Sequence, residues 1–253
     1  MKANRSSDIS PSHAELLPDF WPRRIKSYVL RAGRTTAAQQ RAIEELGSEY
    51  IVPFQSNTID WSQIFSNREP ALRILENGFG MGETTAYIAK IRPQDDFLAI
   101  EVYEPGVGAL LKRIGEDGIS NIRIIRHDAV EVLEHMIADE SLDGVHLYFP
   151  DPWHKKKHHK RRLVQDEWVK KLCEKLKLGA YIHMATDWQE YAQQMLAILS
   201  KQTWLENSAT SGGGSSSIDD GYSVRPDYRP VTKFENRGLQ LGHGVWDLIF
   251  RKR

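Results

Sequence analysis

Short apolar runs alternate with longer amphipathic stretches through the middle of this chain. The apolar runs lie at 71–76, 96–102, 121–126, 143–149 and 179–185, and helical periodicity follows each of them, at 83–91, 104–116, 129–137, 164–176 and 188–200. Apolar strands that alternate with helices are typical of βαβ units, whose parallel sheet is covered on both faces. The pattern therefore predicts an α/β fold with a mostly parallel central sheet and helices on both faces.

The C-terminal region departs from this pattern. Residues 208–217 are mainly Gly and Ser, which is typical of a flexible polar loop. After it the chain runs through 231–238 to an apolar segment at 244–251. A strand that returns after a loop predicts an antiparallel pair at one edge of the sheet.

The N-terminal region is polar and then basic. Residues 1–20 lack the apolar centre of a secretory signal, and we expect a disordered tail there. We expect 21–69 to form a basic arm with a helical extension, and 70–253 to form the main domain.

The connections in such a fold direct attention to one rim of the sheet. Right-handed crossovers bring every loop that follows a strand to the same side. The polar residues to consider are therefore those in the loops after Glu76, Glu101, Arg126, Phe149 and Ala185.

A glycine-rich loop follows the first predicted strand. Its sequence from Glu76 to Gly82, ENGFGMG, has the form E-x-G-x-G-x-G, whereas dinucleotide-binding proteins carry G-x-G-x-x-G. Glycines let the backbone turn sharply and approach a ligand, but the acid before them would repel a pyrophosphate. The loop therefore favours a nucleoside that carries positive charge, such as S-adenosylmethionine.

Two more acids follow the next two predicted strands. Glu101 stands where a carboxylate can accept hydrogen bonds from ribose hydroxyls, and Asp128 stands within reach of an adenine amino group. Each signal alone has an ordinary explanation, because Gly80 or Gly82 could simply close a turn and Asp128 could N-cap the next helix. Their order and spacing together favour the S-adenosylmethionine site.

The loop after the fourth predicted strand combines a carboxylate, an indole and a basic run. Asp151 lies between two prolines, which fix φ and stiffen the segment, and Trp153 follows. An Asp carboxylate can accept from N1–H and the 2-amino group of guanine together. Trp153 can stack on a base, although a core indole fits the sequence equally well. Residues 155–162 carry six Lys or Arg, typical of a phosphate-binding run, a solvated charged loop or a localisation signal.

Charge is unevenly distributed along the chain. The 34 Lys and Arg balance 34 Asp and Glu, but eleven of the basic residues lie in 21–34 and 153–162, which contain no acid. An acidic body with two basic segments suits a polyanion bound on one face. The single cysteine, Cys173, excludes an intrachain disulfide, favours a cytoplasmic location and is expected to be a small core residue. No apolar run reaches the roughly 18 residues of a membrane span.

Two further polar motifs lie towards the C-terminus. Asp187 follows the fifth predicted strand and either N-caps the next helix or faces the crevice. The motif Thr232-Lys233-Phe234-Glu235 could, on sequence alone, be an ordinary strand with one polar face. No grouping of His, Cys and carboxylates has metal-ligand spacing, so we expect no metal.

Together these motifs resemble those of the bacterial tRNA (guanine-N7-)-methyltransferases over about 70–250. The Asp-Pro-Trp run and the Thr-Lys-Phe-Glu motif are specific, whereas the glycine loop alone is not. The resemblance implies a Rossmann-like class I methyltransferase with an antiparallel C-terminal edge. It implies S-adenosylmethionine as methyl donor, S-adenosylhomocysteine as product, tRNA as partner, and N7 of a guanine in the variable loop as target. The motifs that carry it are Leu75–Gly82, Ile100–Val102, His127–Ala129, Phe149–Lys155 with the basic run, Ala185–Trp188, Thr232–Glu235 and Gly242–Leu248.

The resemblance also implies roles for single residues. Cofactor binding falls to Glu76, Gly78, Gly80, Gly82, Glu101, Asp128 and Asp151, and Asp151 is also the implied catalytic residue. Substrate binding falls to Lys155, Asp187, Thr232, Lys233, Phe234 and Glu235. RNA contacts fall to Lys157, His158, His159, Lys160, Arg161 and Arg162. We expect a monomer, with a homodimer as the alternative.

One position departs from the family pattern. Asn77 stands where the family usually has an aliphatic residue, and a polar side chain there is expected to loosen the strand end or to find a backbone partner. The alternative function is a non-catalytic RNA-binding protein on the same fold, against which the intact acids argue. A small-molecule or protein methyltransferase would have no use for the basic run.

Overall fold

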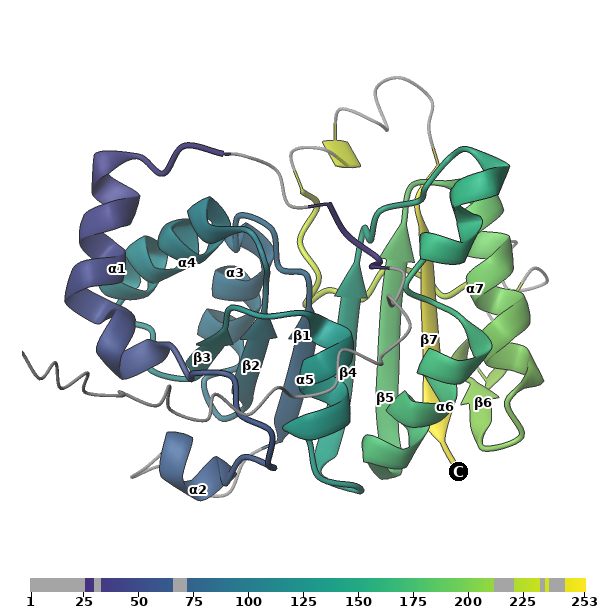
Figure 1. Ribbon diagram of the computed structural model, residues 1–253. Helices are drawn as coiled ribbons and strands as arrows, with labels where there is room; N and C mark the ends of the chain where they lie inside the picture. Colours follow the sequence, from purple (N-terminus) through teal and green to yellow (C-terminus); the bar gives the residue numbers. More distant parts are fainter. Residues whose placement is uncertain (1–25, 30–32, 66–71, 212–220, 233–234, 237–243) are drawn as a thin grey trace, which may run out of the picture.

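Seven strands form one sheet within the residues that the computed structural model describes, which are 26–29, 33–65, 72–211, 221–232, 235–236 and 244–253. Their order across the sheet is β3-β2-β1-β4-β5-β7-β6 (Figure 1). The predicted tail at 1–20 and most of the predicted loop at 208–217 lie outside the described residues. The strands are β1 (Arg73–Asn77), β2 (Asp96–Ile100), β3 (Ile122–Ile125), β4 (Leu142–Tyr148), β5 (Leu176–Thr186), β6 (Leu205–Asn207) and β7 (Trp246–Lys252).

Strand directions confirm the predicted mixed sheet. β1 to β5 pair in parallel, β7 runs antiparallel to β5, and β6 runs antiparallel to β7. The antiparallel edge is therefore the pair β7 and β6, and β6 comes before the Gly/Ser segment rather than after it. Three residues, Leu205 to Asn207, are too short a run to show an alternating pattern in the sequence.

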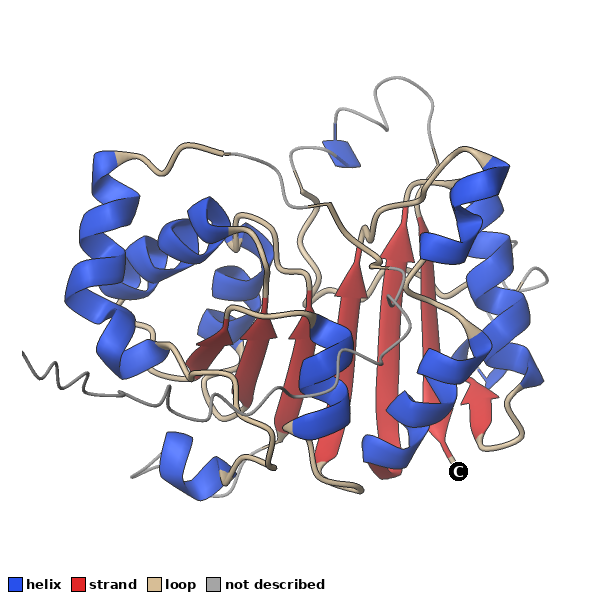
Figure 2. Ribbon diagram, in the orientation of Figure 1, coloured by secondary structure: helices blue, strands red, loops and turns tan. Residues whose placement is uncertain are grey.

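Helices cover both faces of the sheet, as predicted (Figure 2). One face packs against α1, α3 and α4, and the other packs against α2, α5, α6 and α7. Neighbouring residues of β1 serve the two cores, since Ile74 belongs to the first and Leu75 to the second. This is why β1 reads as a continuous apolar run. The helices are α1 (Ala37–Tyr50), α2 (Trp61–Ile64), α3 (Glu83–Ile91), α4 (Glu104–Asp117), α5 (Ala129–His135), α6 (Asp166–Lys175) and α7 (Gln189–Lys201).

The chain's single cysteine is part of the core on the α6 side. Cys173 is 3% exposed and packs within the cluster that includes Val169 and Leu172. Burial raises the pKa of its thiol to about 11. The thiol is therefore protonated at neutral pH, and the prediction of a small core residue is confirmed.

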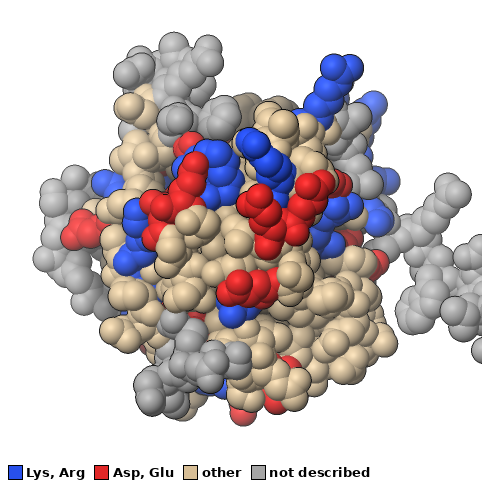
Figure 3. All heavy atoms as spheres, turned by 90° about the vertical axis from the view of Figure 1, so that its left-hand side faces the viewer, with Lys and Arg blue, Asp and Glu red and all other residues tan. Residues whose placement is uncertain are grey.

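Charges of both signs are interspersed on the face around α1 and α4 (Figure 3). Ion pairs there include Arg113 with Glu83 and Lys112 with Glu116, at 2.9 Å and 2.7 Å. A mixed surface of this kind creates no strong field of one sign, so it is not suited to a polyanion. Across the described ranges, the helices are all too short or too polar to cross a membrane.

Candidate active site

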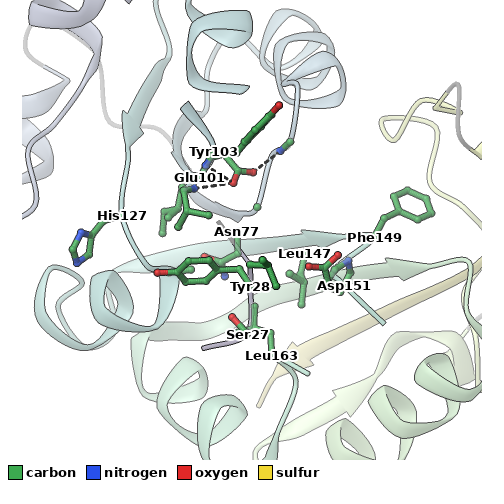
Figure 4. Close-up of a pocket in the computed structure, with 17 residues that line it drawn as sticks. Ser27, Tyr28, Asn77, Glu101, Tyr103, His127, Leu147, Phe149, Asp151 and Leu163 are labelled. Carbon is green, nitrogen blue, oxygen red and sulfur yellow. Dashed lines mark hydrogen bonds between the residues drawn. The ribbon is translucent and has the colours of Figure 1, made fainter. Parts of the chain in front are cut away.

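A pocket of about 370 Å³ opens at the carboxyl ends of β1, β2 and β4. Its volume lies within the range of about 300–1,000 Å³ that is usual for small-molecule sites. Glu101, Phe149 and Asp151 come from the loops after the strands, and Ser27 and Tyr28 come from the N-terminal segment (Figure 4). The site therefore lies where open parallel sheets bind their ligands.

Two glycines of the loop after β1 form an open cradle. Gly78 and Gly80 line the pocket at φ values of 75° and 58°, and a Cβ added at either would meet nothing within 4 Å. Gly106 in the first turn of α4 lets that helix approach, because a Cβ there would lie 2.1 Å from the Gly80 carbonyl oxygen. Gly106 carried no recognisable signal in the sequence, since a glycine in a helix has no fixed meaning.

Gly82 has a packing role that the sequence did not reveal. It is not among the pocket-lining residues, and a Cβ there would lie 2.7 Å from Cβ of Leu110. Gly82 is also the N-cap of α3, with a φ of 71°. Gly82 thus permits close packing of α3 against α4, and its predicted contact with the cofactor stays a prediction.

Glu101 shapes the upper wall of the pocket. Its carboxylate accepts backbone N–H groups from Gly80 at 2.8 Å, Val102 at 2.8 Å and Tyr103 at 3.0 Å, drawn as dashed lines in Figure 4. Burial raises the pKa of this carboxyl, while the three backbone donors oppose the rise. A carboxylate has about four acceptor positions, so capacity remains for a hydroxyl.

Glu76 precedes the pocket-lining residues Asn77 and Gly78, and although it is not itself among the lining residues, it is the most perturbed carboxyl near the site. It is 3% exposed, and its Oε1 accepts from the Thr85 hydroxyl at 3.1 Å. Its Oε2 is buried without a hydrogen-bond partner among the described residues. Burial raises the pKa of Glu76 to about 7, against the opposing effect of Thr85. A buried acceptor of this kind suits a cationic group.

Asp128 has the capping role that the sequence left open. Its side chain accepts the backbone N–H of Val130 at 3.0 Å and so N-caps α5. The residues on either side of it, His127 and Ala129, line the pocket. Asp128 therefore stands beside the pocket, and its contact with adenine stays a prediction.

The backbone on both sides of Asp151 is strained. Phe149 and Trp153 have φ values of 51° and 45°, in the left-handed region that bulky residues rarely adopt. The N–H of Phe149 still donates to Ala185 O at 2.8 Å, so β4 ends there and the chain turns sharply into the rim. Such strain persists only where surrounding contacts hold the backbone, so the backbone on both sides of Asp151 is held in place.

Trp153 and Arg161 hold the N-terminal segment against the pocket. The Trp153 indole N–H donates to Ser27 O at 3.0 Å, and the Arg161 guanidinium lies 3.8 Å from the centroid of that indole. Arg161 also donates to the carbonyl oxygens of Lys26 and Tyr28. The Arg161 guanidinium thus covers one face of the indole, and base stacking by Trp153 stays a prediction.

The basic run forms a 3₁₀ helix over Lys156–Arg161, and its lysines are exposed. Arg162 is not. It is 2% exposed and donates to Pro152 O at 2.8 Å and to Gln194 Oε1 at 2.5 Å. The structure contradicts the predicted RNA contact of Arg162, because its guanidinium supports the Pro-Asp-Pro loop from within.

Comparisons with known proteins show the family to which the chain belongs. A family described as "Putative methyltransferase" matches residues 70–248. A tRNA (guanine-N(7)-)-methyltransferase of Cupriavidus necator is 59% identical over 251 residues, covering 99% of this chain and 91% of that protein. The chain belongs to the tRNA (guanine-N7-)-methyltransferase family. A second member, from Cupriavidus metallidurans, is 62% identical over 232 residues, covering 92% of this chain and 85% of that protein.

Among solved structures, an rRNA methylase from Streptococcus thermophilus matches with a TM-score of 0.48 and 12% identity, over 74% of this chain and 90% of that chain.

Asp187 of this methyltransferase lies exposed at the rim. The N-cap of α7 is Trp188, and the Trp188 N–H donates to the Thr186 hydroxyl at 3.3 Å. The capping alternative for Asp187 is therefore wrong, and its substrate-binding role stays a prediction. Lys155, in the loop after β4, is also exposed, and its substrate-binding role likewise stays a prediction.

The methyltransferase motif Thr232–Glu235 contains a capping box. The Thr232 hydroxyl accepts the N–H of Glu235 at 3.0 Å, and Glu235 Oε2 accepts the N–H of Thr232 at 3.3 Å. Residues 235–236 are helical, so a strand at this motif is wrong. Lys233 and Phe234 lie outside the described residues. The sequence pattern T-x-x-E is typical of a capping box, so this helix start could have been predicted.

Glu235 and Asp247 bind a buried arginine that the sequence analysis missed. Arg229 is 1% exposed and donates to Glu235 at 2.7 and 2.9 Å and to Asp247 at 2.7 and 2.8 Å. Glu235 is itself 4% exposed and both its carboxylate oxygens accept from Arg229, so its substrate-binding role stays a prediction. The guanidinium lies 5.6 Å from the Phe149 ring centroid, so the cluster supports the start of the Asp151 loop.

His183 extends this cluster into the sheet. Its Nε2 lies 2.7 Å from Asp247 Oδ1, and its Nδ1 lies 3.0 Å from the Tyr148 hydroxyl and 2.8 Å from the Tyr228 hydroxyl. Burial lowers the pKa of His183, although Asp247 opposes this. A neutral ring that donates from Nε2 to Asp247 and accepts at Nδ1 fits these partners.

Proposed function

We propose that this methyltransferase transfers the methyl group of S-adenosylmethionine to N7 of a guanine in the variable loop of tRNA. One arrangement carries the proposal. Asp151 joins a nucleoside-sized pocket to a run of exposed lysines within a single loop. The pocket suits the methyl donor and the lysines suit phosphates, so the acid between them suits the reacting base.

The residues present fit the methyl donor. Gly78 and Gly80 leave room for close approach, Glu101 keeps acceptor capacity for ribose hydroxyls, and the buried Glu76 carboxyl suits an ammonium or sulfonium. When bound, S-adenosylmethionine supplies an electrophilic methyl group on a sulfonium.

The chemistry at guanine N7 requires alignment rather than proton removal. N7 carries an in-plane lone pair and no proton, so no general base is needed. Holding N7 in line with the methyl carbon and sulfur therefore contributes most to the rate. Positive charge develops on the purine, and we assign its electrostatic stabilisation and the orientation of the base to Asp151.

Incubation of the protein with unmodified tRNA and labelled S-adenosylmethionine tests the proposal. Nucleoside analysis is expected to find the label in N7-methylguanosine at the variable loop. Label on N1 or N2 of guanine, or no labelled RNA, would overturn it. A protein that binds tRNA but does not bind S-adenosylhomocysteine by calorimetry would instead be the non-catalytic alternative. Independence from metal, a monomeric state and a cytoplasmic location stay predictions.

Replacing Lys157 and Lys160 together by Ala should weaken tRNA binding and flatten its salt dependence. Each phosphate contact that is lost reduces the slope of log K against log salt by about 1. The comparison is Lys112→Ala on α4, where the ammonium pairs with Glu116 on the mixed-charge face. Filter binding at several salt concentrations measures the slopes, and equal slopes for all three proteins would assign the run another purpose.

Cofactor affinity should rise with pH in a way that depends on Glu76. With a pKa of about 7, Glu76 is mostly protonated at pH 6 and mostly ionised at pH 8. The ammonium group of S-adenosylhomocysteine is bound better by the ionised carboxylate, so affinity relative to Glu76→Gln should rise about tenfold over this range. Calorimetry with S-adenosylhomocysteine on both proteins cancels the titration of the ligand itself. If the ratio of the wild-type affinity to the Glu76→Gln affinity does not change with pH, Glu76 does not bind the ammonium group.

A further inference from the structure

The amide of Asn77 is buried and lacks partners at the wall of the pocket. Asn77 is 2% exposed, it ends β1, and it is one of the pocket-lining residues (Figure 4). Neither its Oδ1 nor its Nδ2 has a hydrogen-bond partner among the residues that the structure describes. Both expectations from the sequence are wrong, because β1 remains paired up to Asn77 and the side chain finds no backbone partner.

Leaving an amide in this state is unfavourable for the fold. A buried donor or acceptor without a partner loses its hydration and gains nothing in return. Asn121 shows the usual solution in the same protein, since its Nδ2 donates to the carbonyl oxygens of Ala89, Arg92 and Asp95 at 2.9–3.1 Å. The Asn77 amide therefore requires a partner that comes from the pocket.

The residues that line the pocket indicate which kind of ligand group can hydrogen-bond the Asn77 amide. The side chains of Ile100, Leu147 and Leu163 in the pocket lining carry no polar atom. The polar lining residues, among them Tyr28, Glu101 and His127, make no hydrogen bond to the amide. A primary amide presents one acceptor and two donors within a few ångströms. Both ends of S-adenosylmethionine offer complementary groups, the adenosyl part through ring nitrogens and hydroxyls and the amino-acid part through its carboxylate and ammonium.

We propose that Asn77 is a cofactor-binding residue of this protein, with its amide hydrogen-bonded directly to the methyl donor. The proposal rests on the proposed function, because the ligand is S-adenosylmethionine. It gives Asn77 two opposite effects: the side chain destabilises the ligand-free fold and strengthens the complex. An aliphatic residue of the same shape should stabilise the ligand-free fold and weaken the complex.

The test replaces Asn77 by Leu, which has the same branched shape without polar atoms. We expect the melting temperature of the ligand-free protein to rise by about 2–8 °C. We expect S-adenosylhomocysteine to bind about tenfold more weakly by calorimetry. 5′-Methylthioadenosine, which lacks the amino-acid part, locates the contact. An equal loss for both ligands assigns the amide to the adenosyl part, and a loss for S-adenosylhomocysteine alone assigns it to the amino-acid part.

Asn121→Leu is the matched control. It removes a satisfied amide away from the pocket, so it should lower the melting temperature and leave the affinity of the folded protein unchanged. If wild type fails to bind S-adenosylhomocysteine, the proposed function fails. If wild type binds and Asn77→Leu binds equally well, the proposal for Asn77 alone is overturned. A lower melting temperature of Asn77→Leu with unchanged affinity would also overturn it, by giving the amide a structural role.

Discussion

Asp151→Ala should lower the single-turnover rate of methyl transfer by about 10²–10³-fold with saturating tRNA and cofactor. Removing one preorganised group that stabilises transition-state charge typically has an effect of this size. The backbone of Asp151 lies between two left-handed residues, Phe149 and Trp153. Glu101 is the other acid among the described pocket-lining residues, and its carboxylate already accepts three backbone N–H groups. Rapid-quench measurement of labelled N7-methylguanosine gives the rate.

Asp151→Asn separates charge from shape. It keeps an oxygen acceptor and the side-chain volume but loses the negative charge, so its rate should stay close to that of Asp151→Ala if electrostatics dominate. The comparison variant is Asp139→Ala, an exposed acid paired with Lys175 on the surface. A wild-type rate for Asp151→Ala would remove the residue from the mechanism.

Arg229→Met should lower the free energy of unfolding by about 3–5 kcal/mol. The substitution removes the cation that pairs with Glu235 and Asp247 and leaves two buried carboxylates without their partner. For a chain of this length the melting temperature should fall by about 10 °C. Urea unfolding at pH 7, followed by circular dichroism, measures the change.

Two comparisons make this result specific. Arg126→Met removes an exposed arginine that pairs with Glu104 at 2.7 Å, and it should change stability by less than 1 kcal/mol. Adding Glu235→Gln and Asp247→Asn to Arg229→Met should recover part of the loss, because the buried charges are then gone as well. Additive losses in the triple variant would show that the charges do not act as one cluster.

Much of the fold was predictable because its strands are buried on both faces. Ile74 and Leu75, or Phe97 and Leu98, point to different cores, and this produces runs that stand out from the helices between them. β6 was missed because three residues cannot show a period. Its place at the edge depends on pairing with β7, which lies about 40 residues further along the chain.

The acids at the rim were predictable because strand order fixes their position, as the pocket-lining residues Glu101 and Asp151 illustrate. Burial of charged residues was not predictable in the same way. Arg162 belongs to a run of cations and looks exposed in the sequence, yet its partners Pro152 and Gln194 enclose it. Arg229 needs two carboxylates from other segments before its burial is favourable, and no local pattern indicates such partners.

The buried thiol of Cys173 can report when α6 separates from the sheet. A thiol with a pKa of about 11, within a packed core, reacts with a disulfide reagent only after α6 separates from the sheet. It is the chain's one cysteine, so every modified molecule records an opening at the same place. The labelling rate, measured with and without S-adenosylhomocysteine, then shows whether a ligand in the pocket slows the opening of α6. The measurement needs no introduced probe.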